Sequence, residues 1–186
     1  SDRTDSPVSL YAATKKSNEL IAFSYSHLFK IPCTGLRFFT VYGPYGRPDM
    51  AYYKFAKSID NGEKIDVYNN GNMKRDFTYI DDIIKGLKRV MYEVPNEMPS
   101  KYSSAEAPSR VLNIGNNNPV TLLEFIQAIE ASLGKKADKN FLPMQPGDVP
   151  STYADIDDLV DLVGFKPKTS IDDGMKNFIN WFQGNK

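Results

Sequence analysis

Cysteine and histidine are almost absent from this 186-residue sequence, which has one of each, Cys33 and His27. A single cysteine excludes a disulfide bond within the chain and any metal site built from clustered cysteines. With one histidine, a zinc ion would need several carboxylate ligands. We therefore expect no bound metal, and we interpret Cys33 and His27 as packing or surface residues.

An excess of one charge is lacking too. The 23 basic residues balance the 23 acidic ones, and no run of lysine or arginine is longer than two. Nucleic acids and anionic membranes are bound by clustered positive charge, so we expect neither as a partner. The sequence has no stretch of about 18 apolar residues, and its polar start does not fit a signal peptide. These features predict a cytoplasmic protein whose partner is a small molecule or another protein.

Hydrophobic residues make up 41% of the chain and aromatic residues 12%, enough to bury a sizeable core. Their spacing predicts strands that alternate with helices, which indicates an α/β fold. The strand expected at 33–43 is apolar on both faces, as in a parallel sheet covered by helices. The other expected elements are helices at 10–29, 50–61, 156–162 and 171–182, strands at 64–71 (with an Asn-Gly turn) and 77–79, a helix after Tyr79, a strand in VLNIG, a helix capped by Thr121 and Glu124, and a surface loop at 95–110.

One motif is missing from this α/β pattern. No Gly-x-Gly-x-x-Gly or related glycine-rich turn joins a strand to a helix. In doubly wound folds such a turn holds the pyrophosphate of a dinucleotide. If a dinucleotide is bound, we expect its main binding half to lie outside these residues.

The spacing Tyr-x-x-x-Lys occurs twice, in Tyr11 with Lys15 and in Tyr53 with Lys57. Residues four apart share one face of a helix, where a lysine ammonium stabilises a phenolate and so makes a tyrosine a better base. Tyrosine and lysine are both common in this chain, so the spacing alone also fits a chance match. The surrounding residues must decide between the two pairs.

Five stretches, taken in order, resemble motifs of the extended short-chain dehydrogenase/reductase family: SPVSLYAATKKSNE, GLRFFTVYGPYGRPDMA, RDFTYIDDI, LNIGN and MQPGDVPSTYAD. Within that family the sequence is most similar to NAD-dependent nucleotide-sugar epimerases, in particular UDP-glucuronate 4-epimerases. The resemblance implies the C-terminal part of a Rossmann-type NAD(P)-binding fold plus a small α/β substrate-binding domain. Residues 1–46 would end the Rossmann domain with the catalytic-tyrosine helix and the following strand. Residues 47–186 would be mostly substrate domain, with some segments returning to the Rossmann sheet.

The same resemblance implies NAD-dependent 4-epimerisation of a UDP-sugar, UDP-glucuronate to UDP-galacturonate, through a 4-keto intermediate. Inversion at C4 requires oxidation there, so a hydride leaves for NAD while a base takes the hydroxyl proton. By resemblance Tyr11 is that base, and Lys15 supports it and binds the nicotinamide ribose. Both residues are thus expected to be catalytic and cofactor-binding. Tyr53 with Lys57 is interpreted as a surface coincidence.

The resemblance also implies a UDP-sugar site. Arg75 matches the family arginine at the diphosphate, a role that suits a planar guanidinium, and the alternative is that Arg75 only pairs with Asp76. Asp148 would accept hydrogen bonds from the uridine ribose. Gln145 stands where galactose-type epimerases carry an arginine, which favours the uronate branch. The other expected contacts are Thr40 at the sugar carboxylate (alternatively only a β-former), Arg47 (alternatively a solvated loop residue), Met50 and Ala51 around the sugar, and Val67 and Tyr68 near the uracil.

Two other functions fit the same motifs. A nucleotide-sugar 4,6-dehydratase or decarboxylase of this family shares the tyrosine and the lysine, and a non-catalytic nucleotide-sugar-binding module would bind UDP without turnover. Because the cofactor-binding half is expected elsewhere, we expect the isolated chain to be inactive. The resemblance further implies a homodimer in the intact enzyme, formed through the helix that carries the tyrosine and its neighbour.

Overall fold

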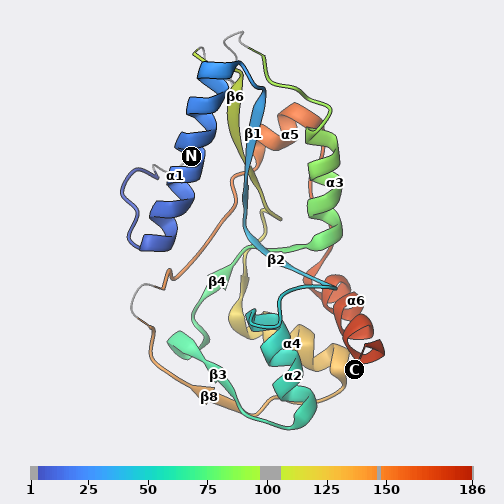
Figure 1. Ribbon diagram of the computed structural model, residues 1–186. Coiled ribbons are helices and arrows are strands. Elements are labelled where there is room, and N and C mark those ends of the chain that lie inside the picture. The colour runs from blue at the N-terminus through green and yellow to red at the C-terminus, as the bar shows by residue number, and fades with distance from the viewer. Residues whose placement is uncertain (1–3, 97–105, 146–147, 186) are drawn as a thin grey trace. The chain divides into compact units, whose positions relative to one another are not determined.

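The computed structural model describes residues 4–96, 106–145 and 148–185 of the chain (Figure 1). The chain forms two compact units. The first unit comprises Ser1–Phe38, Lys85–Ile114 and Asp155–Lys166, and the second comprises Phe39–Ile84, Gly115–Ala154 and Pro167–Lys186. The predicted boundary at residue 46 separates a Rossmann domain from a substrate domain. That is a different division from these two units, and it stays a prediction.

The first unit begins with the long helix α1 (Leu10–Phe29), which confirms the helix predicted at 10–29. Ser9 is its N-cap, and the Ser9 hydroxyl accepts a hydrogen bond of 3.1 Å from the Ala12 N–H. The helix ends at Lys30, whose φ of 54° is left-handed. Ser26 is the buried residue of α1, so most of the helix surface is open.

The centre of the first unit is a parallel pair of strands, β1 (Cys33–Phe38) and β6 (Ser109–Ile114), in register from Cys33 opposite Ser109 to Phe38 opposite Ile114. The helix α1 flanks this pair on one side (Figure 1). On the other side lie α5 (Asp157–Val163) and the last turns of α3 (Ile80–Val90). Parallel strands covered by helices on both faces confirm the predicted α/β fold.

The single strand predicted at 33–43 is wrong, because the structure divides it into β1 and β2 (Thr40–Tyr42). The two strands have different partners: β1 pairs with β6, and β2 pairs in parallel with β5 (Phe77–Tyr79). The Thr40 N–H donates to the Asp76 carbonyl oxygen at 3.2 Å, which directs the chain to β5. The strand at 77–79 and the helix after it are confirmed as β5 and α3.

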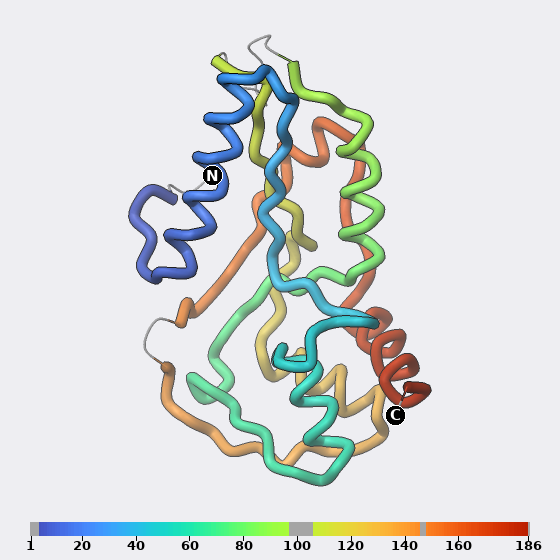
Figure 2. The backbone as a smooth tube through the Cα atoms, in the orientation of Figure 1, coloured from blue at the N-terminus to red at the C-terminus, as the bar shows by residue number. Residues whose placement is uncertain are grey.

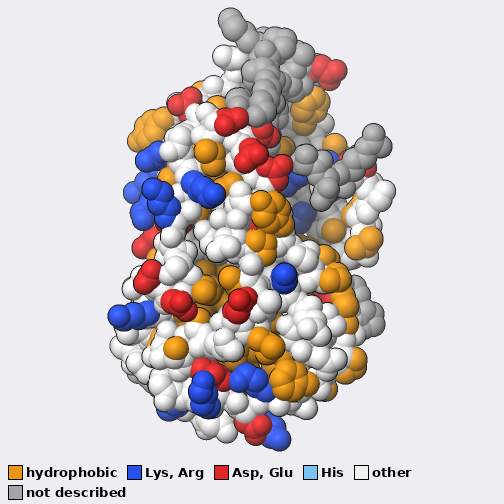
Figure 3. Space-filling model, turned by 180° about the vertical axis from the view of Figure 1, so that it is seen from behind, with side chains coloured by type: hydrophobic (Ala, Val, Ile, Leu, Met, Phe, Trp, Pro, Cys, Tyr) orange, Lys and Arg blue, Asp and Glu red, His pale blue; other side chains and the backbone are white. Residues whose placement is uncertain are grey.

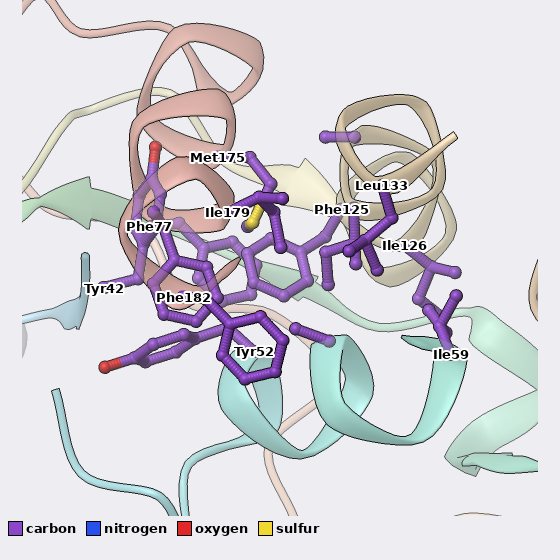
Figure 4. Close-up of a cluster of buried hydrophobic side chains, with 14 of the residues drawn as sticks. Tyr42, Tyr52, Ile59, Phe77, Phe125, Ile126, Leu133, Met175, Ile179 and Phe182 are labelled. Atoms are coloured by element: carbon purple, nitrogen blue, oxygen red, sulfur yellow. The ribbon is translucent and has the colours of Figure 1, made fainter. Parts of the chain in front are cut away.

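The core of the second unit is rich in aromatic side chains, which pack among aliphatic ones (Figure 4). Phe77 of β5 and Phe125 of α4 (Leu122–Leu133) stack with ring centroids 3.9 Å apart. Tyr42 of β2 meets both rings edge-on, with centroids 6.3 Å and 6.2 Å away. The helices α2 (Ala51–Asn61) and α6 (Ile171–Gly184) supply further side chains to this core.

Two short strand pairs complete the second unit. β3 (Ile65–Val67) and β8 (Lys139–Phe141) are parallel and lie side by side in Figure 2. β4 (Lys74–Arg75) and β7 (Val120–Thr121) are antiparallel. The strand predicted at 64–71 is shorter, because its Asn-Gly end forms the 3-10 turn η1 (Tyr68–Gly71). This turn is fixed by a distant segment, since the Asn70 N–H donates to the Leu142 carbonyl at 3.0 Å.

The remaining helix predictions are confirmed with small changes at the ends: α2, α5 and α6 match the helices expected at 50–61, 156–162 and 171–182. The capping box of α4 is present, with the Glu124 N–H donating to the Thr121 hydroxyl at 3.1 Å. The loop predicted at 95–110 ends too late, because β6 already begins at Ser109. Residues 97–105 of that loop lie outside the described residues. Over the described parts of the chain, every helix is too short or too polar to cross a bilayer.

Candidate functional site

Tyr11 and Lys15 lie in the first turns of α1, in the first unit. The Lys15 ammonium is 5.3 Å from the centroid of the Tyr11 ring, within the range of a cation–π contact. The Tyr11 side chain is 72% exposed, and Lys15 is exposed as well. The first unit therefore presents a tyrosine beside a cation at a position that an outside molecule can reach.

Both side chains line a cleft of about 550 Å³ that is formed by residues of α1, β1 and β6. Glu19 and Arg37 also line this cleft. They form a bidentate ion pair: Arg37 Nε donates to Glu19 Oε1 at 2.6 Å, and a terminal guanidinium nitrogen of Arg37 donates to Glu19 Oε2 at 2.8 Å. The hydrogen bond from Arg37 lowers the pKa of Glu19 and so favours its charged form.

This ion pair was not predicted from the sequence. An arginine inside the otherwise apolar stretch CTGLRFF is the signal that could have found it, because a charge in a covered strand needs a partner. Arg37 ties β1 to α1 through Glu19, which fixes the helix that carries Tyr11 and Lys15.

The second Tyr-x-x-x-Lys match has a structural role. Tyr53 packs against the core of the second unit, with its ring 5.5 Å from that of Phe182 and 6.1 Å from that of Phe178. Lys57 is exposed on the same helix, α2. The interpretation of this pair as a surface coincidence is thus wrong for Tyr53, which is half-buried against the core.

Arg75 and Asp148 lie on adjacent segments of the second unit, because the Lys74 N–H donates to the Pro150 carbonyl at 2.9 Å. Burial lowers the pKa of Arg75, and the nearby Asp148 carboxylate opposes that shift. Both residues are half-buried. The Arg75 guanidinium donates to the Lys74 carbonyl at 2.9 Å. The alternative in which Arg75 only pairs with Asp76 is wrong, because the Asp76 carboxylate accepts main-chain N–H groups instead.

The residues expected around the sugar lie in the second unit as well. Thr40 begins β2 and is half-buried, and its N–H is bonded to the Asp76 carbonyl. Arg47 is exposed, and its Nε donates to Asp49 Oδ1 at 3.0 Å. Met50 is the N-cap of α2 and packs on the core, while Ala51 begins that helix and is exposed. Their assignment to a sugar site stays a prediction.

The two residues expected near the uracil differ in burial. The Val67 side chain is fully buried in the core, and its carbonyl accepts a hydrogen bond of 3.0 Å from the Leu142 N–H. Tyr68 begins η1 and is half-buried. A role in base recognition therefore suits the Tyr68 side chain better than that of Val67.

Charged side chains of both signs lie on the surface. Acidic and basic side chains both occur across the face shown in Figure 3, with hydrophobic ones between them. Within residues 4–96, 106–145 and 148–185, no three or more His, Cys, Asp or Glu side chains are grouped so that they could hold a metal ion.

Helices on both faces of a parallel strand pair, with an exposed tyrosine beside a lysine at a cleft, define an α/β protein with a site suited to proton transfer. The chain belongs to the NAD dependent epimerase/dehydratase family, whose model matches residues 1–115. The similarity to Rossmann-fold members of this family described below agrees with the predicted fold class.

Curated relatives match almost the whole chain. Protein CapI of Staphylococcus aureus is 57% identical over 98% of this chain and 56% of its own length. A probable UDP-glucuronate 4-epimerase of Rhizobium meliloti is 50% identical over 99% of this chain and 56% of its own length. The chain thus spans about half the length of the curated relatives it matches.

A solved structure shows the same fold. The UDP-glucuronic acid 4-epimerase from Bacillus cereus, crystallised with UDP-glucuronic acid and NAD, superposes with a TM-score of 0.82 at 34% identity. The match covers 96% of this chain and 54% of that one.

Proposed function

We propose that this chain is the proton-transferring and substrate-binding part of an NAD-dependent UDP-glucuronate 4-epimerase. The observation that carries the proposal is the geometry of α1, where Lys15 lies over the ring of an exposed Tyr11 at the edge of a cleft. Relatives that carry the name UDP-glucuronate 4-epimerase match nearly the whole chain, which supports this substrate over other UDP-sugars.

In the proposed reaction, Tyr11 takes the proton of the sugar C4 hydroxyl while the hydrogen on C4 leaves as a hydride. Lys15 favours the phenolate by its positive charge, so that Tyr11 can act as the base. After the 4-keto sugar has turned over in the site, the opposite face of C4 would take the hydride back, and Tyr11 would return the proton to the C4 oxygen. One side chain thus serves as base and then as acid.

NAD suits these residues only in part. The exposed Tyr11 and Lys15 side chains offer a hydroxyl and an ammonium to a nicotinamide ribose. The sequence has no glycine-rich turn for the pyrophosphate. When bound, NAD supplies the acceptor for the C4 hydride. Because this sequence has no glycine-rich turn to hold the NAD pyrophosphate, the isolated chain is expected to be inactive.

The second unit is the proposed site for the UDP-glucuronate. Arg75 would bind the diphosphate, and Asp148, which lies near it, would accept hydrogen bonds from the uridine ribose. Half-burial of both residues supports this role, because charge-assisted hydrogen bonds are stronger in a partly desolvated site. The remaining proposed contacts are Thr40, Arg47, Met50 and Ala51 at the sugar and Val67 and Tyr68 at the uracil.

The test is proton NMR of the chain mixed with UDP-glucuronate and NAD. We expect saturation transfer from the protein to the uridine protons, no new anomeric signal, and loss of the transfer in Arg75→Ala. A matched control is Arg89→Ala, in an exposed arginine of the first unit that donates to the Val163 carbonyl at 3.2 Å. UDP-galacturonate formation would confirm the reaction but contradict the expected inactivity. Absence of transfer in the wild type would contradict the UDP site.

A homodimer through α1 is part of the same proposal. Large apolar side chains of this helix are exposed, among them Leu20, Ile21, Leu28 and Phe29. Exposed apolar surface of this kind is typical of an interface.

The cytoplasmic location stays a prediction from the sequence.

A further inference from the structure

Asp76 is a fully buried carboxylate in the second unit, with none of its surface exposed. Its Oδ1 accepts a hydrogen bond of 2.8 Å from the Asn116 N–H. Its Oδ2 accepts two more, each 3.0 Å long, from the N–H groups of Asn117 and Ala154. The Asp76 N–H itself donates to the Thr152 hydroxyl at 3.2 Å. One residue thus joins three segments that are far apart in the sequence.

The segment of residues 148–154, here called the Asp148 segment, is held to β4 by these bonds and by main-chain bonds of Lys74. The Lys74 N–H donates to the Pro150 carbonyl at 2.9 Å, and the Thr152 N–H donates to the Lys74 carbonyl at 3.1 Å. Arg75, the residue between Lys74 and Asp76, belongs to the same strand. The contacts of Asp76 therefore lie at the junction between the strand that carries Arg75 and the segment that carries Asp148.

Only a carboxylate suits this position. Three N–H donors converge on two oxygens, and an ionised carboxylate has acceptor sites for all of them and no donor of its own. An asparagine would turn its NH2 group toward at least one of these main-chain N–H groups. That N–H and the NH2 group would then both be buried without an acceptor. The structure therefore ties the geometry at this junction to the chemistry of one side chain.

We propose that Asp76 is a positioning residue for UDP binding, because its carboxylate fixes the Asp148 segment against the strand that carries Arg75. The inference rests on the proposed function for its ligand. It adds a residue that does not touch the nucleotide but sets the separation of the two residues that would bind the diphosphate and the ribose. The main chain of Asp76 also contacts Thr40, the residue predicted to bind the sugar carboxylate. The Thr40 N–H donates to the Asp76 carbonyl, so Thr40 lies next to the same junction.

Asp82 provides a matched control in the same unit. It too is a buried carboxylate, 4% exposed, and its Oδ2 accepts main-chain bonds of 3.0 Å and 2.8 Å from the N–H groups of Lys168 and Thr169. These bonds fix the segment before α6, which carries none of the proposed UDP contacts. Asp82→Asn therefore makes the same chemical change as Asp76→Asn at a place where UDP binding should not depend on it.

The experiment combines hydrogen exchange, read by mass spectrometry, with calorimetric titration of UDP into the wild type, Asp76→Asn and Asp82→Asn. We expect Asp76→Asn to speed exchange in residues 148–154 about tenfold and to raise the Kd for UDP about tenfold, consistent with the loss of buried hydrogen bonds. Asp82→Asn should leave the exchange in residues 148–154 and the Kd within about twofold of the wild type, because the Lys168 and Thr169 N–H groups share one oxygen of Asp82, which the amide oxygen of asparagine can replace.

A milder variant covers the case in which Asp76→Asn does not fold. Thr152→Val keeps the side-chain shape but removes the acceptor of the Asp76 N–H, and it should shift exchange and Kd in the same direction by a smaller factor. Unchanged exchange in residues 148–154, or an equal loss of UDP affinity in Asp82→Asn, would overturn the inference. If the wild type binds no UDP, the proposed function fails at this site. The exchange pattern then decides alone whether Asp76 fixes the Asp148 segment.

Discussion

Lys15 Nζ lies over the ring of Tyr11, 5.3 Å from its centroid, on one face of α1. The helix sets this relationship, because residues four apart are neighbours on its surface and Ser9 fixes where the first turn begins. Tyr53 and Lys57 have the same spacing on α2, yet Tyr53 packs into the core. The same spacing thus leaves the tyrosine exposed on α1 and packs it against the core on α2.

This contrast gives a prediction for catalysis. In a chimera that places the upstream half of the Rhizobium meliloti relative before Ser1, Tyr11→Phe should lower kcat by about 10²-fold or more, because the proton acceptor is lost. Lys15→Met should lower kcat as well. Tyr53→Phe is the matched control and should leave kcat unchanged. The measurement follows the anomeric proton of UDP-glucuronate by NMR, and equal rates in Tyr11→Phe and Tyr53→Phe would contradict the assignment.

A second prediction concerns stability in acid. Glu130 is buried on α4, and burial raises its pKa. The hydrogen bonds from Lys139, the Ala137 N–H and Lys136 outweigh this effect and lower the pKa of Glu130 to about 2. A carboxylate whose folded-state pKa is depressed stabilises the fold above its unfolded-state pKa and loses that contribution as the pH falls.

The free energy of unfolding should therefore decrease between about pH 4.5 and pH 2, and Glu130 should account for about 3 kcal/mol of the decrease. Urea unfolding of the wild type and Glu130→Gln at several pH values measures this share. The two curves should converge as the pH falls through this window, since the protonated wild type resembles the glutamine variant. Parallel curves would show that Glu130 is not the group that titrates.

The elements that the sequence predicts well are those with local signals. The helix at 10–29 begins at a serine cap, and α4 begins at the box of Thr121 and Glu124. The break between β1 and β2 has no such signal, because RFFTVYG is apolar throughout. The break depends on the bond from the Thr40 N–H to the Asp76 carbonyl, whose position only the fold determines. The paired strands β3 and β8 are also far apart in the sequence, so no local signal predicts that they pair.

The candidate site divides in the same way. Tyr11 and Lys15 follow from helical spacing and family resemblance, and both are local features of the sequence. The grouping of Asn116, Asn117 and Ala154 around Asp76 arises from three segments, so no spacing in the sequence indicates it. An aspartate between an arginine and a phenylalanine is a weak signal on its own.

A third prediction concerns the loop that carries Arg47. A Cβ added to Gly46 would overlap the hydroxyl group of Tyr52, so Gly46→Ala should lower the free energy of unfolding by about 1–3 kcal/mol. Removing that hydroxyl with Tyr52→Phe should recover part of the loss. Gly184→Ala is the control, because a Cβ there meets no atom within 4 Å. Additive effects of Gly46→Ala and Tyr52→Phe in urea unfolding would contradict the proposed clash.

The last prediction tests the exposed face of α1. Leu20 is 58% exposed in the first unit, so Leu20→Glu should change the free energy of unfolding by no more than about 0.5 kcal/mol. If this face forms the proposed homodimer, the same change should weaken self-association, because it places a charge in an apolar contact that excludes water. Sedimentation velocity over a range of concentrations separates the two effects.

Met91→Glu is the matched control for this test. Met91 is a side chain of similar size that is 68% exposed and follows α3 instead of lying on α1. A wild type and a Met91→Glu variant that associate equally, beside a monomeric Leu20→Glu variant that unfolds at the same urea concentration, would confirm α1 as the interface. If all three proteins sediment alike, the apolar face of α1 does not hold two copies of this chain together.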